Sequence, residues 1–271
     1  MRLSRKLRLC LITTVAAVAA TSGTVLGLGT PAYAASVNYV ALGDSYSSGV
    51  GAGSYISSSG SCKRSTNAYS ALWAAANAPT SYSSVACSGA VTSDVINSQV
   101  SALSASTTLV SITIGGNDAG FSNIMTTCVL QGTTQCVAAV QSAETYAQNT
   151  LPAKLDQTYA AIRSHAPNAK VIVLDYPVFY LLNQPLCVGL SETSRAKIDE
   201  GINIIDGVIQ AAAGRAGFTF ADVRSRFVGH QLCSGGTKWL HALNFLDLGI
   251  SYHPTAAGHS GGYLPTFAAA V

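Results

Sequence analysis

Short, apolar, β-rich segments alternate with stretches of helical composition along most of this chain. The apolar segments are residues 39–42, 109–114, 171–174 and 218–221. Strands that are joined through helices normally lie parallel, because each helix carries the chain back across one face of the sheet. The alternation therefore predicts an α/β fold with a central parallel sheet.

Two helices have the clearest support in the sequence. One is predicted over residues 137–164, where Pro152 would kink or break it. The other is predicted over residues 194–213, because four isoleucines recur there at helical spacing: Ile198, Ile202, Ile205 and Ile209.

Residues 1–34 have the features of a secretory signal peptide. Four basic residues precede an apolar run over residues 9–28, and Ala32-Tyr33-Ala34 forms a typical cleavage site before Ala35. The alternative is a retained membrane anchor, because the apolar run is about long enough to cross a bilayer. Cleavage would leave a secreted protein with a single domain over residues 35–271.

The excess of basic residues belongs to this N-terminal segment. The whole chain has 15 Lys and Arg against 12 Asp and Glu, and residues 1–34 hold four of the basic residues and none of the acidic ones. The remainder has 11 basic and 12 acidic residues, a net charge of −1. We therefore expect no nucleic-acid partner, because phosphate binding requires a basic surface.

Six cysteines follow residue 34, and an even number in an exported chain indicates disulfides. A zinc site is the alternative, although no Cys-x-x-Cys pair occurs at ligand spacing. The segments 54–61 and 126–134, rich in Ser, Thr and Gly, lie beside cysteines and are predicted to be loops held by these bonds. Of 15 possible pairings, the order along the chain favours neighbours: Cys62 with Cys87, Cys128 with Cys136, and Cys187 with Cys233.

A serine follows the first predicted strand, in the sequence Gly43-Asp44-Ser45. This position places its hydroxyl at the carboxyl edge of a parallel sheet, where α/β folds carry their sites. A serine hydroxyl becomes a good nucleophile only when a base removes its proton, and histidine is the usual base. Ser45 is therefore the candidate nucleophile.

His253 is the best candidate for that base among the five histidines. It stands immediately before a predicted proline-initiated helix, in a loop that can return to Ser45. His165 lies at a predicted helix end, where a cation favours the helix dipole. His230 and His241 lie in a loop region without a motif, and we interpret all three as surface residues.

Four short motifs resemble, in type and order, those of the GDSL, or SGNH, hydrolases. The resemblance covers residues 39 to about 264 and is closest to the disulfide-bonded actinobacterial lipases and phospholipases of that family. It implies a flavodoxin-like three-layer α/β/α sandwich, and the same three sequential disulfides. The motifs are Gly43-Asp44-Ser45, Ser88-Gly89-Ala90, Gly115-Gly116-Asn117-Asp118 and His253-Pro254.

The resemblance also implies an oxyanion hole. Its donors would be the backbone N–H groups of Ser45 and Gly89 and the side-chain amide of Asn117, and a tetrahedral intermediate needs such preorganised donors. Glycine at position 89 permits close backbone approach, although Gly89 and Asn117 taken singly would be ordinary turn residues. Asp44 is expected to bond nearby backbone N–H groups and not to act as a catalyst.

The sequence departs from the family pattern at Ile250, where the family usually carries an acid three residues before the histidine. The nearest upstream acid, Asp247, would reach His253 only if the loop folded over. The main-chain carbonyl of Ser251 could instead accept a hydrogen bond from His253 Nδ1 and fix the tautomer. We therefore favour a Ser-His dyad over a triad with Asp247.

A second serine motif, Gly258-His259-Ser260-Gly261-Gly262, fits the G-x-S-x-G pattern of α/β-hydrolases. That fold places its histidine after the serine, and none follows Ser260. We expect this stretch to start or pack the terminal helix, with His259 packed or hydrogen-bonded.

Taken together, these features predict a secreted carboxylic-ester hydrolase, and the resemblance indicates lipid esters as substrates, as in a lipase or phospholipase A1. The alternatives are a carbohydrate acetyl esterase on the same fold and a non-catalytic binding module. Trp73 and Trp239 are the only tryptophans that could serve as platforms for sugar rings. No cofactor or metal is implied, and we expect a monomer that binds a lipid or small ester and contacts lipid surfaces transiently.

Overall fold

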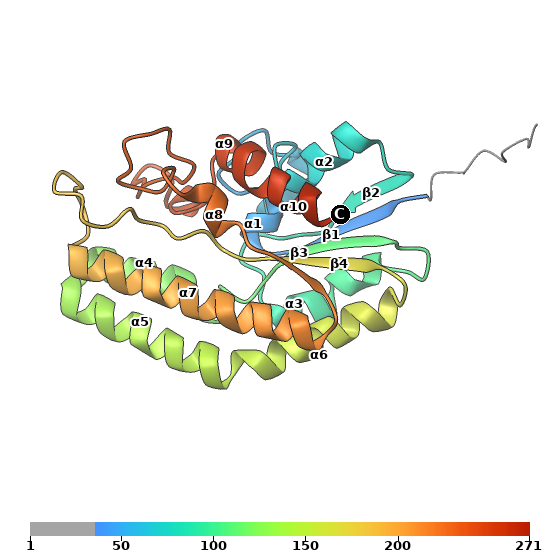
Figure 1. Ribbon diagram of the computed structural model, residues 1–271, viewed down its shortest axis with the longest axis horizontal. Coiled ribbons are helices and arrows are strands. Elements are labelled where there is room, and N and C mark those ends of the chain that lie inside the picture. The colour runs from blue at the N-terminus through green and yellow to red at the C-terminus, as the bar shows by residue number, and fades with distance from the viewer. Residues whose placement is uncertain (1–35) are drawn as a thin grey trace, which may run out of the picture. The chain divides into compact units, whose positions relative to one another are not determined.

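Five parallel strands form one sheet in the computed structural model, which describes residues 36–271 (Figure 1). The order across the sheet is β2-β1-β3-β4-β5, and every pairing is parallel. This is the strand order of flavodoxin-like folds. The predicted signal peptide lies outside the described residues. The strands are β1 Asn38–Gly43, β2 Ser81–Ser84, β3 Leu109–Thr113, β4 Lys170–Leu174 and β5 Thr219–Ala221.

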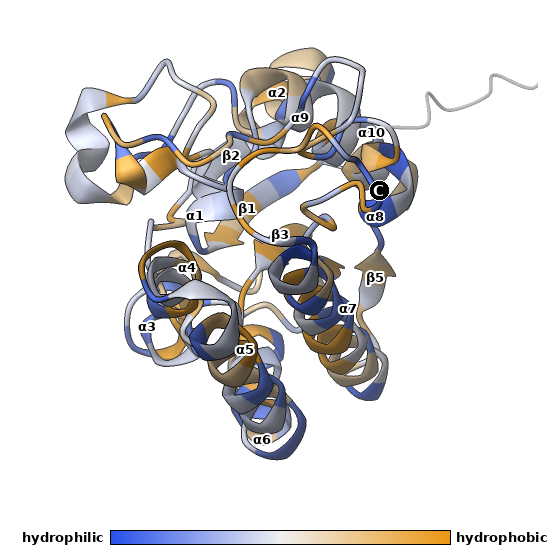
Figure 2. Cartoon of the chain, turned by 90° about the vertical axis from the view of Figure 1, so that its left-hand side faces the viewer, coloured by the Kyte–Doolittle hydropathy of each residue, from blue (hydrophilic) through white to orange (hydrophobic). Residues whose placement is uncertain are grey.

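Helices cover both faces of this sheet, as Figure 2 shows when the strands are viewed end on. One face carries α3 Thr92–Asn97, α5 Gly132–Asn149, α6 Leu151–His165 and α7 Glu192–Arg215. The other carries α2 Tyr69–Asn77 and α10 Leu264–Ala270. The fold is therefore the predicted three-layer α/β/α sandwich. Shorter helical segments are α1 Ser45–Ser48, α4 Phe121–Leu130, α8 Arg224–Phe227, α9 Ala256–Gly258, η1 Ser57–Cys62, η2 Gln99–Ala102, η3 Leu248–Ile250 and η4 His259–Tyr263.

The central strands read as nearly continuous apolar runs because helices bury them on both faces. Leu42 of β1, Ile112 of β3 and Val173 of β4 are fully buried. The isoleucine stripe of α7 is buried against the same core, as its spacing predicts: Ile198, Ile202, Ile205 and Ile209.

One predicted loop is wrong, because residues 126–134 are mostly helical. The segment contains the end of α4 and the start of α5, and the chain turns between them at Gly132, whose φ is +80°. The helix accommodates Thr126, whose hydroxyl donates a hydrogen bond to the Ser122 carbonyl one turn earlier, at 2.8 Å. Residue 137, where the helical composition begins, therefore lies within α5 and not at its start.

Of the two prolines that the sequence places at a helix break or start, one does so in the structure and the other does not. Pro152 breaks the predicted 137–164 helix into α5 and α6, and it lies in the first turn of α6. Pro254 does not initiate the following helix, which begins at Ala256. Thr255 caps that helix, because its hydroxyl accepts the Gly258 N–H at 3.1 Å.

Three disulfides join the neighbouring cysteines: Cys62 to Cys87, Cys128 to Cys136, and Cys187 to Cys233. The second ties α4 to α5, and the first ties η1 to the loop after β2. Within residues 36–271 there is no helix whose length and apolar character would let it span a membrane.

Candidate active site

Ser45 lies at a tight turn from strand to helix. Gly43 ends β1 with a φ of +119°, and a side chain there would collide with the Thr113 carbonyl oxygen, 2.3 Å from the Cβ position. The Asp44 carboxylate caps α1 by accepting the Tyr46 N–H at 3.0 Å. Ser45 is therefore the first residue of a helix, with its own N–H free of helical bonding.

Asp44 holds this turn, which is the role predicted for it. Its Oδ1 accepts a hydrogen bond from the Thr113 hydroxyl at 2.7 Å, and its Oδ2 accepts one from the Tyr176 hydroxyl. Burial raises the pKa of Asp44 to about 6, although these donors favour its charged form. No sequence motif marks Tyr176, but its position just after β4 places it at the same edge of the sheet.

His253 lies beside Ser45, and the two side chains form a hydrogen bond. His253 Nε2 is 2.8 Å from Ser45 Oγ, and His253 Nδ1 is 3.0 Å from the Ser251 carbonyl oxygen. With Nδ1–H donating to that carbonyl, Nε2 is the ring atom that accepts a hydrogen bond from the Ser45 hydroxyl. Burial lowers the pKa of His253 to about 4, so the ring is neutral at pH 7.

Asp247 points elsewhere. It caps η3, where its Oδ1 accepts the Gly249 N–H at 3.1 Å, and it is exposed to solvent. Ile250 occupies the last position of η3. Within residues 36–271 the Ser251 carbonyl is therefore the only hydrogen-bond partner of His253 Nδ1.

The backbone around His253 is fixed from two sides. Tyr252, with a φ of +65°, donates its N–H to the His241 carbonyl at 2.8 Å, and the His253 carbonyl accepts the His241 N–H at 2.9 Å. The Tyr46 hydroxyl donates to the Tyr252 carbonyl at 2.8 Å. These bonds hold the imidazole against the α1 turn, which a flexible loop would not do.

The other histidines have structural contacts. His165 Nδ1 is 2.9 Å from the Ala161 carbonyl at the end of α6, and the His230 ring stacks on Trp239. The predicted surface position of His241 is wrong, because the residue is half-buried and its Nε2 is 2.8 Å from the Gly51 carbonyl oxygen. Its only sequence signal is a position twelve residues before His253.

The G-x-S-x-G stretch forms no strand-to-helix turn. It runs from α9 into η4, and the exposed Ser260 hydroxyl donates to the Ala257 carbonyl at 3.4 Å. His259 is fully buried and accepts the Tyr69 N–H at 3.3 Å. The stretch thus packs the terminal helix, as predicted.

The three predicted oxyanion-hole donors are free to bind a ligand. Within residues 36–271 the backbone N–H groups of Ser45 and Gly89 have no protein acceptor. Gly89 has a φ of +82°, and the space around its Cβ position is open. Glycine is therefore favoured there by the backbone conformation and not, as predicted, by a close approach of other atoms. Asn117 lines the same pocket as Ser45, and its side-chain amide donates to the Ala90 carbonyl at 3.0 Å, which leaves one amide hydrogen free.

An apolar pocket opens beside Ser45 and extends between α5 and α7. It has a volume of about 90 Å³ and is partly open to solvent. Two carboxylates line it, those of Asp44 and Glu144, and Lys197 pairs with Glu144, with its Nζ 2.7 Å from Glu144 Oε2. The pocket's otherwise apolar lining suits a hydrocarbon chain. The apolar lining includes Phe121, Ile124, Val140, Ala147, Phe179, Ile202 and Ile205.

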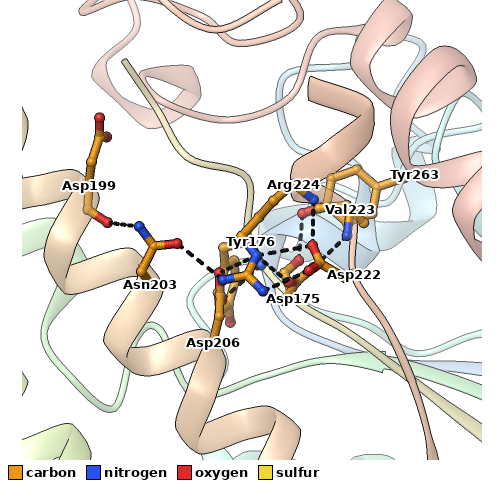
Figure 3. Close-up of polar contacts among 9 residues, drawn as sticks. All are labelled: Asp175, Tyr176, Asp199, Asn203, Asp206, Asp222, Val223, Arg224 and Tyr263. Atoms are coloured by element: carbon orange, nitrogen blue, oxygen red, sulfur yellow. Dashed lines mark hydrogen bonds and ion pairs between the residues drawn. The ribbon is translucent and has the colours of Figure 1, made fainter. Parts of the chain in front are cut away.

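A buried acidic cluster lies beneath this edge of the sheet (Figure 3). Arg224 Nε is 3.3 Å from Asp175 Oδ2 and 3.8 Å from Asp206 Oδ2. Burial raises the pKa of Asp175 to about 8 and raises that of Asp206 well above its usual value. Asp206 also accepts the Tyr176 N–H at 3.2 Å, so the cluster supports the tyrosine that contacts Asp44.

Comparisons with known proteins agree with this geometry. Residues 41–260 match the model of the GDSL-like Lipase/Acylhydrolase family. The chain is 58% identical over 232 residues to Lipase 1 of Streptomyces coelicolor, a match that covers 86% of each chain.

Two solved structures are also similar. A phospholipase A1 from Streptomyces albidoflavus NA297 aligns with a TM-score of 0.85 and 53% identity, over 88% of this chain and 100% of that one. An extracellular lipase from Streptomyces rimosus aligns with a TM-score of 0.85 and 56% identity, over 87% of this chain and 100% of that one. The chain therefore belongs to the GDSL-like lipase/acylhydrolase family and is a carboxylic ester hydrolase.

Proposed function

We propose that this enzyme is secreted and hydrolyses lipid esters, of the lipase or phospholipase A1 type, through an acyl-enzyme on Ser45. The observation that carries the proposal is the hydrogen bond between Ser45 Oγ and His253 Nε2, 2.8 Å long, at the mouth of an apolar pocket. The pocket favours a long acyl chain over the acetyl group that a carbohydrate esterase removes.

In the first half of the reaction, Ser45 Oγ attacks the ester carbonyl carbon while its proton moves to His253 Nε2. The carbonyl oxygen becomes an oxyanion, which accepts hydrogen bonds from the N–H groups of Ser45 and Gly89 and from the Asn117 amide. The intermediate then collapses, and the leaving alcohol takes the proton from Nε2. The acyl group remains on Ser45 while its chain lies in the apolar pocket.

In the second half, water attacks the acyl carbon and gives a proton to His253 Nε2, which returns it to Ser45 Oγ as the fatty acid leaves. The Ser251 carbonyl keeps the imidazole in the required tautomer throughout. It supplies a dipole where a triad supplies a full negative charge. The pair therefore acts as a dyad.

Covalent labelling tests the nucleophile. A fluorophosphonate probe should attach to Ser45, and peptide mass spectrometry should locate the adduct there. Ser45→Ala should abolish labelling, whereas Ser260→Ala should label normally. An adduct on Ser260, or full esterase activity in folded Ser45→Ala, would refute the assignment.

A panel of esters tests the substrate class. Long-chain phospholipid or glyceride esters should be cleaved with a higher kcat/KM than acetylated xylan or short acetate esters. Preference for acetylated polysaccharide would favour the acetyl esterase instead. Expression of the full chain, followed by N-terminal sequencing of protein from the medium, tests secretion and should find Ala35 first.

A further inference from the structure

Large apolar side chains project into solvent from two loops near the active site. Leu186 and Val188 are each 93% exposed, and Leu246 is 99% exposed. Phe245 and Leu248 are also exposed. We call these five residues the apolar rim.

The two loops of the rim face one another across a single cleft. Leu186 and Val188 from the loop before α7, and Phe245 from the loop before η3, line this cleft together. Tyr180 and Tyr252 lie along it as well. The loops that carry these residues lie at the end of the sheet where the strands finish, the left-hand end in Figure 1.

A disulfide fixes part of the rim outward. Leu186 and Val188 flank Cys187, which is bonded to Cys233. The backbone beneath is paired too, since Leu181 donates its N–H to the Leu232 carbonyl at 2.9 Å. A crosslink that holds two aliphatic side chains in water is unfavourable unless an apolar phase covers them.

The rim is connected to the reaction centre by aromatic contacts. Tyr252, in the cleft, stacks on Phe179 with ring centroids 5.6 Å apart. Phe179 in turn lies 5.9 Å from Phe121, and both line the pocket beside Ser45. Buried aromatic rings therefore connect the cleft by direct contact to the pocket beside Ser45.

Charge near the rim is sparse and of both signs. Lys238 lines the cleft, and Lys63 Nζ and the Asp247 carboxylate both lie beside Gly249. A strongly basic or acidic partner would find no complementary field here. A zwitterionic phospholipid surface, which offers a hydrocarbon interior without net charge, is the partner that this composition fits.

We propose that the apolar rim inserts into the surface of a zwitterionic phospholipid layer and holds the Ser45 pocket against it. This inference rests on the proposed function, because it supplies the substrate to that site. It adds a binding surface whose side chains take no part in the chemistry.

Vesicle binding tests the rim directly. In a Ser45→Ala background, which prevents hydrolysis, we compare the parent with L186S/V188S/L246S in co-sedimentation with phosphatidylcholine vesicles. Each buried aliphatic side chain contributes about tenfold or more to partitioning, so the triple variant should lose at least about 100-fold. The control is Val271→Ser, because Val271 is exposed beside Lys170 at the opposite edge of the sheet. It should bind like the parent.

Kinetics with active Ser45 separate this inference from the proposed function. The triple variant should hydrolyse vesicle phospholipid more slowly, yet cleave a soluble p-nitrophenyl butyrate at the parent rate. Equal vesicle binding by parent and triple variant would overturn the inference. The inference would also be overturned if light scattering showed that the parent is a dimer and the triple variant a monomer, since the rim would then bind a second copy of the chain. If the parent cleaves neither ester, the proposed function fails, while the binding assay still decides the role of the rim.

Discussion

At the scale of single residues, the proposed dyad puts the Ser251 carbonyl in the place of a triad's acid, and this proposal has a direct consequence. Asp247→Asn should leave kcat almost unchanged, because Asp247 caps η3 and makes no contact with His253. His253→Ala should lower kcat by about 10⁴-fold or more, as removal of a catalytic base does. Steady-state rates on one ester measure both. A folded Asp247→Asn enzyme that loses several orders of magnitude would exclude the dyad.

The buried His253 also predicts the pH dependence of the reaction. As the proposed base, His253 would work only when neutral, and burial lowers the pKa of His253 to about 4. The acid limb of kcat/KM should therefore fall near pH 4, and not near the ordinary histidine value of about 6.5. Rates from pH 3.5 to 8 measure this limb, and circular dichroism at each pH checks the fold. A limb near pH 6.5 would contradict the burial of the ring.

At the scale of elements, α5 and α7 form the walls of the apolar pocket beside Ser45. Ala147 of α5 is buried and lines it. Ala147→Leu should shorten the preferred acyl chain, with kcat/KM for long-chain esters falling at least about tenfold and that for acetate nearly unchanged. Ala138→Leu places the same side chain on the exposed face of the same helix and is the control. A uniform loss across chain lengths in Ala147→Leu would indicate misfolding instead.

Elements with strong apolar periodicity were predictable from the sequence. The central strands and α7 follow their patterns because burial on both faces, or along one stripe, selects Val, Ile and Leu. Edge strand β2 escaped prediction, since Ser81–Ser84 pairs only with β1 and is largely polar. Helix α4 escaped it because the stretch from residue 126 to 134, which spans its end, has a Thr-rich composition that resembles a loop, and a disulfide to α5 supports the helix.

The residues of the candidate site also divide into those that the sequence predicts and those that it does not. Ser45, Gly89, Asn117 and His253 lie in recognisable motifs, and the first three follow strands β1, β2 and β3. Tyr176 has no motif, and its contact with Asp44 joins residues 132 positions apart. Such a contact depends on the order of strands across the sheet, which a single sequence indicates only through resemblance.

At the scale of the whole molecule, the cluster of Asp175, Asp206 and Arg224 joins the end of β4 to α7 and α8. Two buried carboxylates share one partly exposed guanidinium. Burial raises the pKa of Asp175 to about 8 and that of Asp206 well above its usual value, so the folded state retains protons that the unfolded state releases. The stabilisation from these protons is complete below the unfolded pKa of about 4 and is lost as the pH rises through the folded pKa.

The thermal midpoint should therefore fall by about 3 to 5 °C between pH 7 and pH 9. Burial lowers the pKa values of His253 and His259, so both are neutral in this range and do not contribute. Asp206→Asn should reduce the fall, because it removes one buried charge and relieves the repulsion that raises the pKa of Asp175. Asp156→Asn, at an exposed ion pair with Arg215, should leave the fall unchanged. Thermal unfolding at the two pH values measures each case, and an equal fall in Asp206→Asn and the parent would exclude the cluster as its source.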